Sequence, residues 1–146
     1  TVKSIAEKSN ITLITNSIEI LLEIPQKNDW RIISTGGEFV RNGLSFAGRQ
    51  AESVIDEYNV DLAVISCKGF DMRKGITDTR DYNAQIKKAF IRSAKKVYLA
   101  VDNTKFDQTS FVRFAEIADI DAVVTDTEPS DEWKSYLSGN NVELYF

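Results

Sequence analysis

The 146-residue chain contains no histidine, one cysteine and two prolines. Without histidine, Ser-His-Asp and Cys-His catalysis and every His-ligated metal site are excluded. The single cysteine, Cys67, excludes an intrachain disulfide and a CxxC pair, which fits a reducing compartment. No apolar run approaches the roughly 20 residues of a membrane span, and the first residues are not a signal peptide. We therefore expect a cytoplasmic protein with no metal, no cofactor and no membrane contact.

An excess of charge of one sign is also missing. Eighteen Lys and Arg residues stand against 22 Asp and Glu residues, which gives a net charge of −4. This balance gives no electrostatic reason for the chain to bind DNA by itself. No GxGxxG or P-loop pattern is present, so dinucleotide or triphosphate binding has no support. The length is that of one domain, and the chain lacks an initiator methionine, so we expect a part of a longer protein.

Short β-branched apolar runs alternate with segments of helical spacing. The six runs are residues 11–15, 30–34, 62–66, 97–101, 122–125 and 142–146. Most are continuous, which is typical of strands buried on both faces, so we expect Ile14→Ala or Val64→Ala to cost a few kcal/mol by leaving a cavity. Helical stripes lie within residues 18–22, 47–58 and 86–93. The pattern predicts a single α/β domain with a mainly parallel sheet flanked by helices.

Two further segments are less regular. Residues 35–46 contain three glycines and are predicted to form a loop with a short strand or hairpin outside the main sheet. Residues 111–117 are predicted to form one more short strand.

Polar residues and glycines follow the predicted strands, where ligands bind in open parallel sheets. The candidate ligand-binding residues are Thr15, Asn16, Ser17, Gly36, Gly37, Lys68, Gly69, Asp71, Thr77 and Lys105. An edge rich in donors and carrying two lysines suits a phosphorylated, polyhydroxylated small molecule. Each feature alone has a simpler explanation: a helix cap at residues 15–17, turns at Gly36-Gly37 and Asp71, and solvated lysines. Their position on successive strand ends supports the ligand site.

Several short motifs occur in one order along the chain. They are ITLITNS (11–17), GGEF (36–39), SFAG (45–48), KGFD with GIT (68–71, 75–77), Lys87 with Ala89, DNTKF (102–106), and DID with TD (119–121, 125–126). Together they resemble, over nearly the whole chain, the C-terminal sensor domain of DeoR-type bacterial transcriptional repressors.

This resemblance implies the fold shared by ribose-5-phosphate isomerase, glucosamine-6-phosphate deaminase and CoA transferases. It also implies an effector-sensing domain for a phosphorylated sugar or related metabolite. In that family an N-terminal winged helix-turn-helix, absent from this chain, reads DNA, and the sensor domain forms an oligomer, here expected to be a dimer or tetramer. The family's first strand ends in D-S-G-T-T and precedes this chain, with Thr1 at the place of its last threonine.

The resemblance also assigns residues. Asn16, Ser17 and Lys105 are expected to hold the phosphate, and Gly36, Gly37, Asp71 and Thr77 to face the sugar. Many relatives carry an acidic residue where this chain has Asn83.

A sugar-phosphate isomerase or deaminase is the alternative function, because it shares the fold. Moving protons on a sugar requires positioned carboxylates, usually more than one. The chain offers Asp71 and Asp102 at strand ends, but no glycine-rich acidic loop and no histidine for ring opening. These observations favour a sensor domain over an enzyme.

Overall fold

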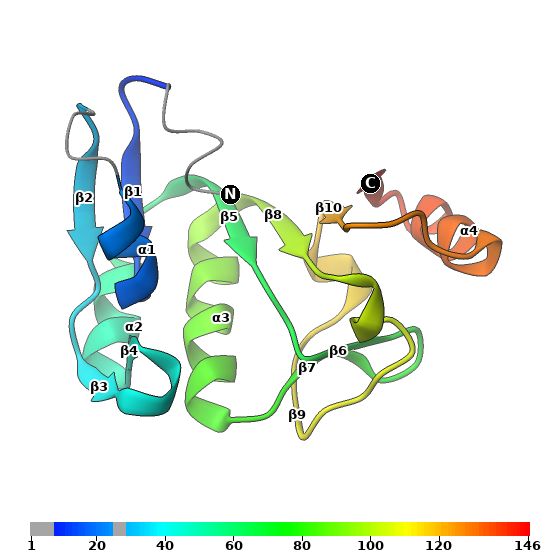
Figure 1. The fold of residues 1–146 in the computed structure, drawn as a ribbon, viewed down its shortest axis with the longest axis horizontal. Helices are drawn as coiled ribbons and strands as arrows, with labels where there is room; N and C mark the ends of the chain where they lie inside the picture. The colour runs from blue at the N-terminus through cyan, green and yellow to red at the C-terminus, as the bar shows by residue number, and fades with distance from the viewer. Residues whose placement is uncertain (1–7, 25–28) are drawn as a thin grey trace. The chain divides into compact units, whose positions relative to one another are not determined.

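The computed structural model describes residues 8–24 and 29–146 and is drawn in Figure 1. It contains two compact units, Thr1–Glu57 and Tyr58–Phe146, and each is described by itself. Thr1, the position compared with the family's first strand, lies outside the described residues.

The first unit contains a two-stranded parallel sheet. Strand β1 (Thr12–Thr15) pairs with strand β2 (Arg31–Ser34), as expected for the first two apolar runs. Thr15 lies opposite Ser34, so the carboxyl ends of both strands lie at the same edge.

A short helix, α1 (Ile18–Glu23), follows β1 directly. It begins at Ser17, whose Oγ accepts a hydrogen bond from the N–H of Ile20 at 3.3 Å. The predicted N-cap is therefore confirmed, because this bond satisfies one of the free amides of the first turn.

The glycine-rich segment forms an antiparallel hairpin in the first unit, as predicted. Strand β3 (Glu38–Val40) pairs with strand β4 (Ser45–Ala47) across the 3₁₀ turn Arg41–Gly43. Helix α2 (Arg49–Asp56) follows and buries Ala51 and Ile55.

A four-stranded parallel sheet forms the centre of the second unit. Its strands, in spatial order, are β11 (Glu143–Tyr145), β10 (Ala122–Val124), β8 (Ala94–Ala100) and β5 (Val60–Ile65). All three neighbouring pairs are parallel. The prediction of a mainly parallel sheet flanked by helices is confirmed in this unit.

Two helices pack beside this sheet. Helix α3 (Asp81–Ser93) joins the second unit's first strands to β8 and buries Ala84, Ile86 and Ala89. Helix α4 (Asp131–Gly139), which the sequence analysis did not predict, precedes β11 and begins at Ser130. None of the helices in residues 8–24 and 29–146 has the length and apolar character that crossing a bilayer requires.

An antiparallel sheet covers one face of the parallel sheet. It consists of β6 (Gly69–Asp71), β7 (Gly75–Asp78) and β9 (Val112–Ala115), with β7 in the middle. The prediction of a strand within residues 111–117 is confirmed, whereas the hairpin of β6 and β7 was not predicted. Two 3₁₀ turns, Asn103–Lys105 and Ile117–Asp119, flank β9.

The core of the second unit lies between the two sheets, α3 and α4. Phe70 of β6 lies with its ring centroid 4.6 Å from that of Trp133 on α4, and Phe106 lies 4.9 Å from the same indole. Leu99 of β8 is completely buried. Val64 of β5, in contrast, is 61% exposed, because its side chain points to the other face of the sheet. The expectation that truncating Val64 leaves a cavity is therefore wrong.

Candidate functional site

In the first unit, Thr15, Asn16 and Ser17 follow β1 and already make bonds within the protein. The Thr15 Oγ1 accepts a hydrogen bond from the N–H of Ser17 at 3.1 Å, and Ser17 caps α1. The Asn16 side-chain amide donates to the carbonyl of Phe46 at 2.9 Å and ties this segment to β4. These side chains thus fix the path of the chain after β1.

Gly36 and Gly37 follow β2 and lie at the same edge, because the N–H of Thr35 donates to the carbonyl of Thr15 at 3.1 Å. Gly37 has a φ of +103°, and a Cβ there would lie 2.6 Å from the carbonyl oxygen of Ala47. Gly36 has a φ of +59° and no atom within 4 Å of its Cβ position. Gly37 is therefore required by packing, whereas Gly36 leaves open space beside the backbone.

In the second unit, Lys68 and Lys105 follow the neighbouring parallel strands β5 and β8. Ile65 lies opposite Leu99, so both lysines lie beyond the same edge of the sheet. Lys68 is exposed. The Lys105 side chain is 28% exposed, and its Nζ lies 3.0 Å from the Thr104 Oγ1.

The loop after β8 is held to the next strand as well. The N–H of Asn103 donates to Asp126, which follows β10, at 2.8 Å. The Asp102 carboxylate accepts from the N–H of Thr104 at 2.9 Å and lies 3.5 Å from the Lys105 ammonium. These bonds position Lys105 on the 3₁₀ turn.

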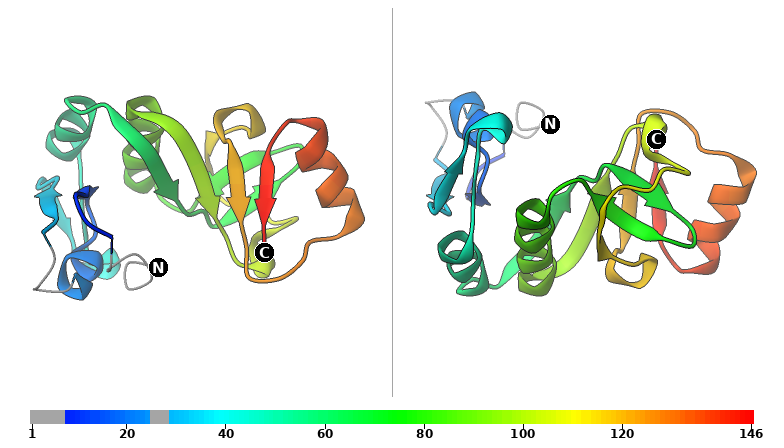
Figure 2. Two further views of the ribbon diagram at one scale, coloured as in Figure 1. Left: turned by 90° about the horizontal axis from the view of Figure 1, so that it is seen from above. Right: turned by 90° about the horizontal axis from the view of Figure 1, so that it is seen from below.

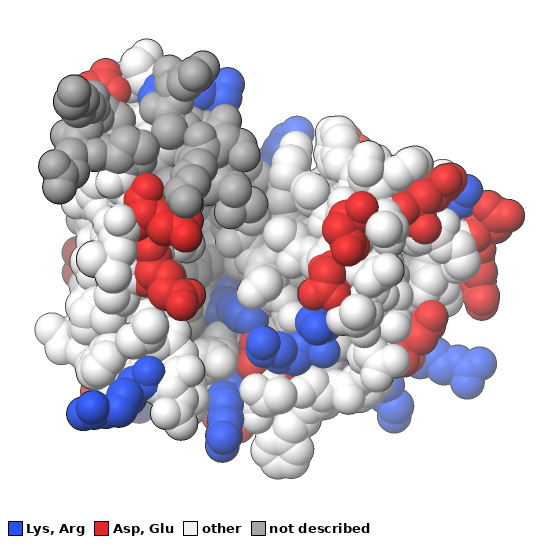
Figure 3. Space-filling view, viewed as in Figure 1, with Lys and Arg blue, Asp and Glu red and all other residues white. Residues whose placement is uncertain are grey.

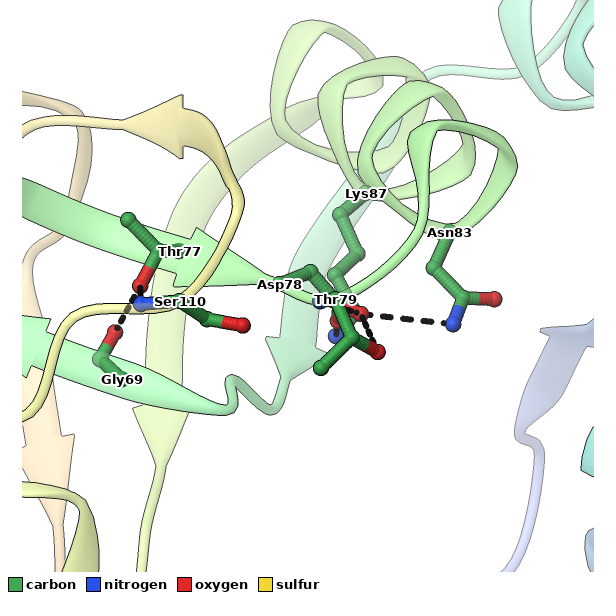
Figure 4. Close-up of polar contacts among 7 residues, drawn as sticks. All are labelled: Gly69, Thr77, Asp78, Thr79, Asn83, Lys87 and Ser110. Carbon is green, nitrogen blue, oxygen red and sulfur yellow. Dashed lines mark hydrogen bonds and ion pairs between the residues drawn. The ribbon is translucent and has the colours of Figure 1, made fainter.

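Gly69 and Thr77 lie opposite each other in the β6–β7 hairpin (Figure 4). A Cβ on Gly69 would lie 2.6 Å from the carbonyl oxygen of Gln108, so no larger residue fits. The buried Thr77 hydroxyl donates to the carbonyl of Gly69 at 3.2 Å and accepts from the N–H of Ser110 at 2.8 Å. Thr77 therefore joins three segments at the edge where Lys68 lies.

Asp71 lies at the turn of the hairpin rather than at its base. Its Oδ1 accepts from the N–H groups of Arg73 and Lys74 at 2.8 and 2.7 Å. These two backbone bonds lower the pKa of the Asp71 carboxyl. The geometry thus agrees with the simpler explanation of Asp71 as a turn residue.

An ion pair that the sequence analysis missed lies beside these residues. Asp78, at the end of β7, bonds to the ammonium of Lys87 on α3, and its side chain is 1% exposed (Figure 4). Its other oxygen accepts from the N–H of Thr79 at 2.7 Å and the amide of Asn83 at 3.3 Å. The Asn83 side chain thus donates to a carboxylate.

Opposing effects act on the titration of Asp78. Burial raises its pKa, but the bond and charge of Lys87 and the bonds from Thr79 and Asn83 outweigh burial, so the pKa is lowered. The carboxylate is therefore ionised at neutral pH.

Cys67 lies between β5 and Lys68, and nearby charged groups affect the pKa of its thiol. Burial raises the pKa of its thiol to about 11, against the lowering effect of the positive charges of Lys87 and Lys105. The thiol is thus neutral, and two cationic groups lie near the end of β5. Over the face drawn in Figure 3, Lys and Arg residues lie among Asp and Glu residues.

The second unit therefore brings together Lys68, Gly69, Thr77 and Lys105 at one edge of its parallel sheet, with Asp78 and Lys87 beside them. Within the first unit, Thr15, Asn16, Ser17, Gly36 and Gly37 lie at one edge of its own sheet. Ammonium groups such as those of Lys68 and Lys105 suit an anion. The described residues contain no cluster of three or more His, Cys, Asp or Glu that could hold a metal ion.

Comparison with known families identifies one that covers most of the chain. The family described as "DeoR C terminal sensor domain" matches residues 1–127. The chain belongs to the DeoR C-terminal sensor domain family. The DeoR resemblance seen in the motifs is therefore confirmed, and the matched region includes both units except for α4 and β11.

Individual relatives of this DeoR sensor domain are transcriptional regulators. An uncharacterized HTH-type transcriptional regulator, YulB of Bacillus subtilis, is 35% identical over 117 residues, 80% of this chain and 45% of the relative. The transcriptional repressor AccR of Agrobacterium fabrum is 32% identical and covers 86% of this chain and 49% of its own length. The glycerol-3-phosphate regulon repressor of Escherichia coli is 26% identical, with 93% and 54% covered.

The DeoR sensor domain spans about half the length of these relatives. All of them are named as transcriptional regulators or repressors, so an enzyme is not indicated. The isomerase or deaminase alternative is not supported.

Proposed function

We propose that this DeoR sensor domain binds a phosphorylated sugar or a related metabolite and thereby controls DNA binding by a bacterial, cytoplasmic repressor. The observation that carries the proposal is the position of Lys68 and Lys105 beyond the same edge of the parallel strands β5 and β8. Gly69, next to Lys68, packs closely against the Gln108 carbonyl and the Thr77 hydroxyl and so holds the backbone beside these lysines in place. A phosphate group suits such a site because each ammonium donates charge-assisted hydrogen bonds to its oxygens.

We propose that the ten candidate residues indicated by the sequence contact this ligand. In the second unit they are Lys68, Gly69, Asp71, Thr77 and Lys105, and in the first unit Thr15, Asn16, Ser17, Gly36 and Gly37. The exposed ammonium of Lys68 and the partly exposed one of Lys105 provide the charge, while Thr77 and Asn16 hold the surrounding backbone in place.

We also propose that a winged helix-turn-helix domain and one further strand with a phosphate loop precede this domain in the whole protein. Two observations support this arrangement. The relatives are about twice as long as the region they share with this chain. Within the described residues, β5 pairs only with β8, so its other edge is free to accept a strand.

Regulation would follow from a shift between two arrangements of a homo-oligomer, a dimer or a tetramer. A ligand that contacts several strand ends stabilises one arrangement by its differential affinity for it. That arrangement changes the spacing of the DNA-binding domains, which must match two half-sites. DNA is contacted only through those domains.

A ligand screen on the full-length regulator tests the proposal. Thermal unfolding is followed with a panel of phosphorylated sugars and polyols, each paired with its unphosphorylated parent. A ligand at about 100 times its dissociation constant adds roughly 2.7 kcal/mol to the free energy of unfolding, which raises the melting temperature by several degrees.

We expect stabilisation by at least one phosphorylated compound and not by its parent. The same compound is expected to change operator affinity in a DNA-binding titration at fixed salt. A panel in which no phosphorylated compound stabilises the regulator, or a stabilising compound that leaves operator affinity unchanged, would contradict the proposal.

A further inference from the structure

A cavity of the second unit is lined by none of the ten candidate ligand residues. It encloses about 210 Å³ between the loop after β8, the segment that follows β10 and the start of α4. Pockets that hold a whole small molecule usually enclose about 300–1,000 Å³, so this cavity suits one part of a ligand. Its lining combines aromatic and polar side chains, among them Phe106, Trp133, Asn103, Asp107, Thr127 and Glu128.

The cavity lies at the carboxyl edge of the parallel sheet, where ligands bind in open parallel sheets. Ala100 of β8 lies opposite Val124 of β10, and Asn103 and Thr127 follow these two residues at equal spacing. The N–H of Asn103 donates to the carboxylate of Asp126 at 2.8 Å, so the two segments are joined. In the left view of Figure 2, the connection from β10 passes the carboxyl end of β11 on its way to α4.

The charge along this edge changes sign from one strand to the next. Lys68 follows β5 and Lys105 follows β8, whereas Asp126 and Glu128 follow β10, which is the next strand in the sheet. Among the described residues that line the cavity, none is a lysine or an arginine. The phosphate of a ligand is therefore attracted to the lysines, and the cavity is left for the opposite end of the same ligand.

Asp107 gives the cavity an uncompensated negative charge. Its Oδ1 accepts a hydrogen bond from the indole N–H of Trp133 at 3.0 Å, and its carboxylate has no ion-pair partner in the described part of the chain. The N–H of Asp107 donates to the carbonyl of Phe70 at 2.9 Å and fixes its position. Glu128, in contrast, lies 2.7 Å from the ammonium of Lys134. A second anionic group in the cavity would thus be repelled by Asp107.

Ligand hydroxyl groups match the polar atoms of the cavity. The side chains of Asn103 and Thr127 are exposed and make no hydrogen bond to the described residues. The amide of Asn103 and the hydroxyl of Thr127 each donate and accept, whereas the Asp107 carboxylate accepts only. A hydroxyl group both donates and accepts and so satisfies all three side chains. A phosphate or carboxylate only accepts, and an ammonium only donates.

We propose that this cavity receives the end of the effector opposite its phosphate, and that this end carries hydroxyl groups and no second anionic group. The inference rests on the proposed function and narrows its ligand to phosphate monoesters of sugars or polyols. Bisphosphates and phosphorylated sugar acids are disfavoured, because their second anionic group would lie beside Asp107. Asn103, Asp107 and Thr127 determine this specificity.

Matched pairs of ligands test the charge of the end that enters the cavity. Isothermal titration calorimetry on the full-length regulator compares glucitol-6-phosphate with 6-phosphogluconate, and fructose-6-phosphate with fructose-1,6-bisphosphate. The members of each pair differ in a terminal group, which is a hydroxyl in one and an anion in the other. We expect the member with the terminal hydroxyl to bind at least about 10-fold more tightly.

Two variants test the hydrogen-bonding residues of the cavity. Asn103→Ala and Thr127→Val change exposed side chains and are each expected to weaken binding of the tightest phosphate monoester in the panel about 3- to 10-fold. Binding of inorganic phosphate, which depends on the lysines alone, is expected to stay unchanged. The control is Ser135→Ala, which removes an exposed hydroxyl of α4 outside the cavity and is expected to bind both ligands like the wild type.

Asp107→Asn tests the negative charge itself. The asparagine keeps an acceptor for the indole N–H of Trp133 but carries no charge, and circular dichroism verifies that the variant folds. The preference for the terminal hydroxyl within each ligand pair is expected to fall at least about fivefold. The matched control is Asp131→Asn, which removes a carboxylate that is 97% exposed and does not line the cavity, and it should keep the wild-type preference.

Three outcomes would each overturn the inference. They are equal or tighter binding of the sugar acid or the bisphosphate, hydrogen-bonding variants that bind the tightest monoester like the wild type, and an Asp107→Asn variant with an unchanged preference. A wild-type regulator that binds no phosphorylated compound contradicts the proposed function instead. The two failures are therefore distinguished.

Discussion

Lys87 of α3 and Asp78 of β7 form an ion pair in which the carboxylate is almost completely buried, with side-chain exposures of 17% and 1%. The Lys87 ammonium also lies 5.2 Å from the centroid of the Phe114 ring. The pair therefore links the antiparallel sheet to the helix that precedes β8, directly beside the proposed ligand edge. We therefore expect substitutions in this pair to change the free energy of unfolding.

Lys87→Met is expected to lower the free energy of unfolding by roughly 3 kcal/mol, because it leaves the Asp78 carboxylate buried without its counter-charge. Urea unfolding measures the change. The matched control is Lys95→Met, which removes the exposed partner of Asp61, with side-chain exposures of 72% and 91%. An exposed pair contributes little, so the control should unfold like the wild type. Equal losses for both variants would contradict a special role of the buried pair.

Acid stability should depend on the same carboxylate. Because the folded-state pKa of Asp78 is lowered, its contribution is fully present above its ordinary pKa of about 3.9 and is lost as the pH falls through the folded-state pKa. Asp78→Asn is therefore expected to flatten the rise of unfolding free energy with pH below about pH 4.

The measurement for Asp78→Asn is a series of urea unfolding curves over that pH range. The comparison with the wild type concerns only the slope, because the substitution also lowers stability at neutral pH by removing the charge partner of Lys87. Identical slopes for the two proteins would show that Asp78 binds its proton equally in the folded and unfolded states.

The Asp78–Lys87 pair is a feature of the candidate site that could not be predicted from the sequence. Lys87 was noted only as part of a family motif with Ala89, and its bond to Asp78, nine positions away across a strand–helix junction, was not predicted. The signal that was present is the Thr77-Asp78 pair at the end of an apolar stretch, followed by Asn83 and Lys87 on one helix face. Which lysine pairs with Asp78 depends on how β7 and α3 pack in three dimensions, and the spacing of residues along the chain does not determine this packing.

The strands, unlike this ion pair, could be predicted from the sequence. Runs of β-branched and other apolar residues favour strands, so β1, β2, β5, β8, β10 and β11 were all located from the sequence. Helix α4 was missed although Ser130 caps it and Trp133 and Leu137 lie four residues apart on its buried side. Its stability comes from the contact of Trp133 with Phe70, which only the fold creates. Val64 fits the same apolar pattern yet is exposed, because a pattern does not say what covers each face.

The two adjacent glycines after β2 should respond differently to alanine. Gly37→Ala is expected to destabilise the first unit by roughly 3 kcal/mol, because φ is +103° and the new Cβ lies 2.6 Å from a backbone carbonyl. Gly36→Ala, with a φ of +59° and open space, is expected to cost roughly 1 kcal/mol.

Amide hydrogen exchange in β1 and β2 measures the local opening free energy of both glycine variants. Because both residues belong to the same turn, any general effect of the substitution cancels in the comparison. If Gly36→Ala proved as costly as Gly37→Ala, close packing against Ala47 would not be the reason for glycine at position 37.

Lys105→Met tests the proposed phosphate contact most directly. Removing one charge-assisted hydrogen bond is expected to weaken binding of the phosphorylated effector about 10-fold or more, measured by isothermal titration calorimetry on the full-length regulator.

The stability of the Lys105→Met variant should change little, because the ammonium is partly exposed and its contacts with Thr104 and Asp102 lie at the protein surface. Lys134→Met is the matched control, since Lys134 also pairs with carboxylates, Glu128 and Asp131, but is not among the proposed ligand contacts. The control should bind the effector like the wild type, and raising the salt concentration should reduce the difference between the two variants, because screening weakens the Lys105–phosphate attraction. Equal affinities of Lys105→Met and the wild type would remove Lys105 from the site and leave Lys68 as the cation to test.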